Sequence, residues 1–72
     1  MELKNRLKEV RTSQSMTQEE LGGAVGVTRQ TIIAIEKQHF VPSVKLSLEL
    51  AHALGVPLDE LFWLEGEKGT LQ

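Results

Sequence analysis

The sequence has no cysteine and no tyrosine, and its 72 positions include only two prolines, two histidines and three aromatic residues. The lack of cysteine excludes disulfide bonds and thiolate metal sites, and His39 and His52 are too few for a zinc site made of histidine alone. A chain this short buries only about 60% of its unfolded surface. A compact helical core, with or without help from dimerisation, must therefore hold the fold together.

Long hydrophobic runs are also missing. No apolar run approaches the roughly 20 residues that cross a bilayer, and residues 1–10 have neither the apolar segment nor the cleavage site of a signal peptide. No stretch alternates apolar and polar residues as a half-buried strand does. We therefore expect a soluble cytoplasmic protein with one domain over residues 1–64 and a polar, disordered tail over residues 65–72.

The net charge of −2 argues mildly against a nucleic-acid partner, but the charges are unevenly distributed. Residues 1–56 contain seven Lys and Arg against six acidic residues, which gives +1. Residues 57–72 contain one Lys against four acidic residues, which gives −3. The first part of the chain can therefore contact phosphates, but few cations are available, so we expect a shallow salt dependence.

Apolar residues recur at helical spacing along most of the chain. Leu3, Leu7 and Val10 predict a first helix over about residues 2–12. A capping box of Thr17 and Glu20 predicts a second helix over residues 18–25. Gly22 inside this helix would allow a crossing helix to approach closely, whereas nothing in the sequence explains Gly23.

Three further helices complete the predicted all-α fold. The second helix ends at Gly26, where a left-handed residue is needed. Thr28 is the predicted N-cap of a third helix that ends at about residue 37, and Ser43 that of a fourth helix ending at residue 54. A short fifth helix is predicted from residue 57 or 58 to residue 64.

The twenty residues Thr17–Glu36 are the strongest indication of function. They predict two short helices joined by a tight turn, with Arg29 and Gln30 in the first turn of the second helix and away from its apolar stripe. In a helix-turn-helix the first helix supports the second, whose N-terminal residues enter the DNA major groove. The pattern therefore predicts that residues 28–37 form a recognition helix.

The chain resembles the Cro/CI (Xre-type) helix-turn-helix family of bacterial and phage transcriptional regulators, especially its short stand-alone members. The similarity covers about residues 3–64, and its specificity lies in the order of five helices with matching junctions. The matching segments are Leu7–Arg11, M-T-Q-E-E-L, V-G-V-T-R-Q-T-I, Ile35-Glu36, Pro42-Ser43 and L-G-V-P-L-D-E-L-F. The resemblance implies a five-helix lambda-repressor-like domain with the helix-turn-helix at its second and third helices.

In that family the recognition helix contacts base edges, which implies this role for Arg29 and Gln30, with Ala34 one turn further on. Arg can pair with guanine O6 and N7, and Gln with adenine N6 and N7. Thr31 or the methyl group of Ala34 could contact a thymine methyl group. The alternative is that Arg29 and Gln30 are ordinary solvated residues, but the docking geometry of the motif favours base contact.

Phosphate contacts are implied around the recognition helix, at Gln18, Thr28, Lys37, His39 and Lys45. Plain solvation is the alternative for Gln18 and for the three residues after the helix. The resemblance further implies a partly buried ion pair between Arg11 and Glu36. The chain departs from the family at Lys37-Gln38, where Asn-Gly is common, and at Pro57, which replaces a polar cap. A different loop path after residue 36 is therefore expected.

Phe62 and Trp63 are adjacent, so one must face outward if the other belongs to the core. Trp63 could fold back over the core, or it could form a dimer interface together with Leu64 and Leu48. We favour the interface, because large aromatic residues act as anchors and one domain this small contacts only half of an operator.

The sequence thus predicts a regulator, in particular a repressor, that binds double-stranded DNA in the cytoplasm, at the nucleoid, as a homodimer on a palindromic site. No cofactor, metal or membrane is expected. Catalysis is not expected either, because no nucleophile elbow or phosphate-binding glycine loop is present. The alternative is an antitoxin-like or adaptor module that uses the same fold to bind a protein partner, which the acidic end of the chain favours.

Overall fold

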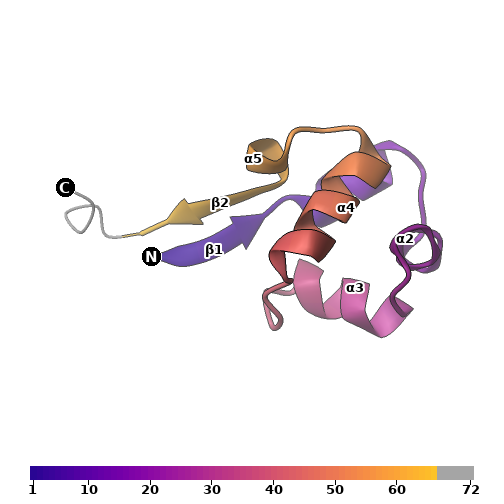
Figure 1. The fold of residues 1–72 in the computed structure, drawn as a ribbon, viewed down its shortest axis with the longest axis horizontal. Helices are drawn as coiled ribbons and strands as arrows, with labels where there is room; N and C mark the ends of the chain where they lie inside the picture. Colours follow the sequence, from indigo (N-terminus) through magenta and orange to yellow (C-terminus); the bar gives the residue numbers. More distant parts are fainter. Residues whose placement is uncertain (67–72) are drawn as a thin grey trace.

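A helical bundle carries a small two-stranded sheet on one side (Figure 1). The computed structural model describes residues 1–66. Its elements, in chain order, are β1 (Glu2–Asn5), α1 (Leu7–Ser13), α2 (Gln18–Val25), α3 (Arg29–Glu36), α4 (Val44–Leu54), α5 (Leu58–Leu61) and β2 (Phe62–Glu65). The five predicted helices are all present in the described part of the chain, and the sheet is an addition to them.

The prediction that the first helix starts near Glu2 is wrong. Residues Glu2–Asn5 form β1, which pairs antiparallel with β2, and the helix begins only at Leu7. In the observed register Leu3 lies opposite Leu64 and Lys4 opposite Trp63. Asn5 ends the strand by accepting a hydrogen bond from the Leu7 amide at its Oδ1. Leu3, Leu7 and Val10 thus keep a helical spacing, although Leu3 lies in a strand and the other two lie in a helix.

The predicted fifth helix is also too long. It ends at Leu61, and Phe62–Glu65 are extended in β2. Phe62 and Trp63 are residue types that favour strands, and β1 supplies the hydrogen-bonding partner that the segment needs. Glu65, which the sequence predicts to begin a disordered tail, is therefore the last residue of a strand. The rest of that predicted tail, residues 67–72, lies outside the described residues.

The hydrophobic core receives at least one fully buried side chain from every helix. These side chains are Leu7 of α1, Leu21 of α2, Ile32 and Ile35 of α3, Leu50 of α4 and Leu61 of α5. Burying a side chain of this size stabilises the fold by about 1.5–3 kcal/mol. α3 thus has a firmly anchored inner face, which fixes the direction in which its outer face points.

The predicted helix caps are present. Thr17 and Glu20 form the full capping box at the start of α2, and the side chains of Thr28 and Ser43 each accept a hydrogen bond from the first turn of α3 and α4. Gly26 ends α2 in the left-handed conformation, with φ of 78°. Within residues 1–66, no helix is both long and apolar enough to cross a membrane.

Candidate nucleic-acid interface

The turn between α2 and α3 is built on a close approach of backbone to backbone. The amide of Val27 donates a hydrogen bond to the carbonyl oxygen of Gly22 at 2.9 Å. A Cβ atom added to Gly22 would lie 2.7 Å from the carbonyl oxygen of Val27. Only glycine leaves room for this turn. A packing reason for Gly22 is thus present, but the close neighbour is the backbone of the turn at Val27 and Thr28, where the sequence predicted a crossing helix. Gly23 has nothing within 4 Å of an added Cβ atom and remains unexplained.

The first turn of α3 presents polar side chains to solvent. The Thr28 hydroxyl accepts a hydrogen bond from the Thr31 amide at 3.3 Å and caps the helix. Arg29 and Gln30 directly follow this cap and are exposed, whereas Ile32 and Ile35 on the opposite face are fully buried. This arrangement holds the helix against the core and leaves its N-terminal turn free to contact a ligand.

A shallow depression of about 350 Å³ lies beside the outer face of α3. Its lining combines three residues of the predicted base-contacting set with two from the following loop, namely Gln30, Thr31, Ala34, His39 and Phe40. The loop is held there because the His39 amide donates a hydrogen bond to the Ala34 carbonyl oxygen at 2.9 Å. Phe40 is 46% exposed and was not among the predicted site residues. An aromatic residue so soon after a predicted recognition helix is the sequence signal that could have identified it.

One carboxylate joins the first three helices. Nε of Arg11 lies 2.7 Å from Oε2 of Glu36, and Nη2 of Arg11 donates to Oε1 at 3.3 Å. The side chains are only 8% and 5% exposed. Nε2 of Gln18 donates to the same Oε1 at 3.0 Å, and Nη1 of Arg11 donates to the Met16 carbonyl oxygen at 2.8 Å. The ion pair expected between Arg11 and Glu36 is thus present, and it also holds the Gln18 side chain.

The loop after α3 turns at a residue other than glycine. Gln38 has a φ of 64°, which is the left-handed conformation that glycine adopts most easily. Where Asn-Gly is common in the family, this chain has Lys37-Gln38, and Gln38 takes the left-handed conformation at the cost of backbone strain. Lys37 and His39, on either side of it, are exposed.

The structure separates Lys45 from the other candidate phosphate contacts. Its ammonium group is paired with the carboxylate of Glu49 at 2.8 Å, one turn further along α4. Of the remaining candidates, Gln18 lies on α2, Thr28 is the N-cap of α3, and Lys37 and His39 follow the end of α3. Lys45 is therefore the member of the predicted set whose charge is already paired.

The residues of the predicted dimer interface do not share one environment. Phe62 is buried and Trp63 is half-buried, with the guanidinium of Arg6 4.7 Å above the centre of its ring. Leu64 follows Trp63 in β2, so it points to the opposite face of the strand. Leu48 and Leu64 are both exposed. Trp63 thus packs against Arg6 of the same chain, whereas Leu48 and Leu64 keep about half of their surface exposed, although Leu64 lies opposite Leu3 in the sheet.

Comparison with known proteins identifies this architecture. The sequence profile of the helix-turn-helix family matches residues 7–61, which include all five helices. The chain belongs to the helix-turn-helix family of transcriptional regulators, Xre (Cro/CI) type. The family assignment, the five-helix lambda-repressor-like fold and a DNA-binding role in transcription regulation, all expected from the sequence, are thereby confirmed.

The relatives of this helix-turn-helix protein are about as long as it is. It is 48% identical to an uncharacterized HTH-type transcriptional regulator, YgzD, of Bacillus subtilis, over 90% of this chain and 98% of that one. It is 44% identical to an uncharacterized HTH-type transcriptional regulator, MJ0272, of Methanocaldococcus jannaschii, over 92% of this chain and all of that one. Relatives of this kind thus occur in bacteria and archaea.

A solved structure shares the fold. The restriction-modification controller protein C.AhdI from Aeromonas hydrophila superposes with a TM-score of 0.72 at 33% sequence identity, over 76% of this chain and 80% of that one.

Proposed function

We propose that this protein is a repressor that binds a palindromic operator as a homodimer, with α3 of each copy in the major groove. The observation that supports this most directly is the contrast between the two faces of α3. Ile32 and Ile35 fix the helix to the core, and Arg29 and Gln30 are free at its N-terminal turn. Helix-turn-helix proteins contact base edges with the residues at this end of the recognition helix.

The chemistry of the exposed turn suggests which bases are contacted. The Arg29 guanidinium matches O6 and N7 of guanine, and the Gln30 carboxamide matches N6 and N7 of adenine. Thr31 and Ala34 line the same depression and present methyl groups that suit the C5-methyl of thymine. We therefore expect a half-site with a guanine and an adenine close together and a thymine nearby.

Phosphate contacts on both sides of the groove would set the position of α3. Gln18 lies at the start of α2, and Thr28 lies at the start of α3. Lys37 and His39 are exposed just after α3, where the loop returns along the helix. Lys37 is the one lysine or arginine among these four residues, so few counterions would be released on binding. We therefore expect modest non-specific affinity and a shallow dependence on salt.

A homodimer follows from the size of the contact surface. One domain offers a single recognition helix, which covers about half of an operator. Two copies related by a two-fold axis would place their α3 helices in successive major grooves about 34 Å apart, on a palindromic sequence. Occupation of such a site within a promoter would exclude the transcription machinery, which gives repression.

The decisive experiment is selection of bound sequences from a random duplex DNA pool. Wild-type protein, Arg29→Ala/Gln30→Ala and a control with the exposed α5 residue Glu60 replaced by alanine would be compared at low salt. We expect a palindromic consensus for the wild type and the control, and its loss in the double variant. A non-palindromic consensus would contradict the homodimer. No enrichment at all would contradict the proposal and favour the alternative role, binding of a protein partner.

A further inference from the structure

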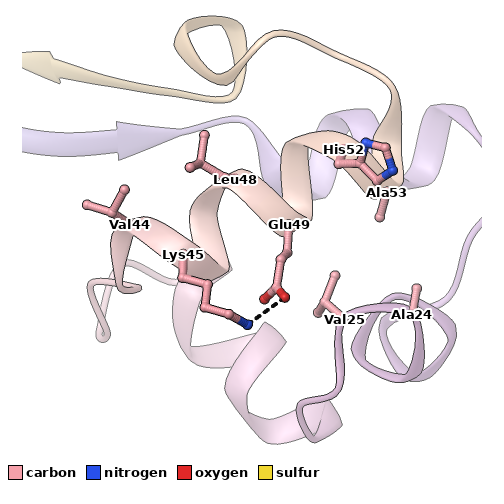
Figure 2. A pocket seen from close by; sticks show the side chains of 8 residues that line it. All are labelled: Ala24, Val25, Val44, Lys45, Leu48, Glu49, His52 and Ala53. Atoms are coloured by element: carbon pink, nitrogen blue, oxygen red, sulfur yellow. Dashed lines mark hydrogen bonds and ion pairs between the residues drawn. The ribbon is translucent and has the colours of Figure 1, made fainter.

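The outward face of α4 carries apolar and charged side chains that the DNA interface does not use. Val44 is 75% exposed and Leu48 is 51% exposed, although both are aliphatic. Beside them, Lys45 and Glu49 form an exposed ion pair at 2.8 Å, as Figure 2 shows. These residues line an open groove of about 870 Å³ that α4 shares with Ala24 and Val25 of α2 (Figure 2).

The spacing of these four residues gives the face a definite order. Val44 and Leu48 are four residues apart and form one row, and Lys45 and Glu49 form a second row beside it. The charged row has its cation nearer the start of α4 and its anion one turn later. A second helix that runs in the opposite direction across this face would present the same two rows with the two charges exchanged.

We propose that two copies of this protein pair through this face, with α4 of one copy antiparallel to α4 of its partner. A two-fold axis at the level of Ser47, perpendicular to the helices, brings Lys45 of each copy opposite Glu49 of the other. The same operation brings the Val44–Leu48 rows of the two copies together. An isologous interface requires this kind of self-complementary surface. This inference rests on the homodimer of the proposed function and names its contact surface.

A second copy suits this face better than a peptide or another protein of one charge. An acidic ligand would pair with Lys45 but repel Glu49, and a basic ligand would do the reverse, whereas an antiparallel copy pairs with both. The present ion pair is open to exchange, because its side chains are 82% and 41% exposed and exposed pairs within a helix contribute little to stability. The Val44 and Leu48 side chains would be removed from water in the same step.

The assignment changes the role of one candidate site residue. Lys45 was expected to contact a phosphate, and its pairing with Glu49 in the free chain already distinguishes it from the other candidates. In the α4-to-α4 dimer its ammonium group faces the partner's carboxylate instead of DNA. Leu48, predicted as an interface residue from the sequence, lies near the centre of the contact.

The test is a charge exchange between chains. Lys45→Glu gives one copy two acidic residues in the charged row, and Glu49→Lys gives one copy two lysines. Each single variant should dimerise at least tenfold more weakly than the wild type, because like charges meet in its homodimer. An equimolar mixture of the two, with one isotope-labelled, should form a heterodimer with wild-type strength. The double variant Lys45→Glu/Glu49→Lys should dimerise as the wild type does.

The readouts separate this inference from the proposed function. Sedimentation and native mass spectrometry give the oligomeric state, and circular dichroism verifies that each exposed variant is folded. Heterodimer formation on mixing supports the α4 interface. If Lys45 and Glu49 acted only within their own chain, the loss in one variant could not be restored by mixing it with the other. If both single variants dimerise as strongly as the wild type, this interface is overturned, but the homodimer of the proposed function is not. A wild type that is monomeric both free and on its selected DNA would overturn both.

Discussion

Gln18 of α2 donates a hydrogen bond from Nε2 to Oε1 of Glu36 in α3, across 3.0 Å. Glu36 is at the same time the partner of Arg11, so its carboxylate connects α1, α2 and α3. A carboxamide nitrogen has two hydrogens, and one of them stays available when the other is bound to Glu36. The buried ion pair therefore fixes the orientation of a side chain that we propose to contact a DNA phosphate.

A Gln18→Ala variant tests this contact. Affinity should fall by a similar factor for every DNA sequence, because phosphates carry no sequence information. The slope of log affinity against log salt concentration should not change, because glutamine releases no counterion. Lys37→Ala is the matched comparison, and its slope should be shallower by about 1. Titrations at several salt concentrations measure both quantities, and a sequence-dependent loss in Gln18→Ala would contradict a phosphate contact.

The Arg11–Glu36 pair is expected to dominate the stability of the helix-turn-helix. Arg11→Ala leaves the 5% exposed Glu36 carboxylate without its cation, so the free energy of unfolding should fall by about 3–5 kcal/mol. Arg11→Met/Glu36→Leu removes both charges and should recover most of that loss, because no unpaired charge remains buried. Urea denaturation of the two variants measures the difference. Equal losses in both would show that the pair does not act through charge.

Two adjacent glycines of α2 should respond in opposite directions to the same substitution. Gly22→Ala places a methyl group 2.7 Å from a backbone oxygen of the turn, and overpacking of this kind costs about 1–3 kcal/mol. Gly23→Ala places its methyl group in open space on an exposed helix, where alanine should stabilise by about 0.5–1 kcal/mol. Thermal or urea unfolding decides the signs. A neutral Gly22→Ala would mean that the turn can widen.

Gln38→Gly should stabilise the loop after α3. Gln38 holds φ at 64°, a left-handed conformation that costs a residue with a side chain roughly 1–2 kcal/mol. Glycine removes this cost but makes the unfolded chain more flexible, so we expect a net gain of about 1 kcal/mol or less. Gln38→Val, which is branched at Cβ, should destabilise and serves as the opposite control. Denaturant midpoints of the three proteins should follow the order Gly, Gln, Val.

Arg29→Ala should relax the preference at one base position without abolishing binding elsewhere. The expected cost is about 1–3 kcal/mol for the preferred base, and much less for the other three. Competition between operators that differ at single positions measures this. An unchanged base preference would show that Arg29 does not contact a base.

Local signals predicted α2, α3 and α4 well, because their ends depend on neighbouring residues. Thr17, Thr28 and Ser43 each cap the helix that the sequence assigned to them. Such capping is decided within a few residues, so no knowledge of the rest of the fold is required. The buried residues of α3 follow from the same local periodicity.

The sheet could not be predicted in this way, because its pairing is non-local. Leu3 continues the helical spacing of Leu7 and Val10, so periodicity favours a helix that starts too early. Whether residues 2–5 form a helix or a strand depends on the partner strand, and Leu3 lies opposite Leu64, which is 61 positions away in the sequence. The link from Gln18 to Glu36 was missed for a similar reason, since three helices must be placed before one carboxylate can connect them.

The pairing of β1 with β2 also has a consequence for the order in which the chain acquires its structure during synthesis. Residues Glu2–Asn5 are made before the helices, whereas their hydrogen-bonding partners Phe62–Glu65 follow all five helices. The packing of α2 against α3 and α4 needs none of β2. A growing chain can therefore complete its helix-turn-helix while its first strand still has an unpaired edge, and β2 closes that edge when it leaves the ribosome.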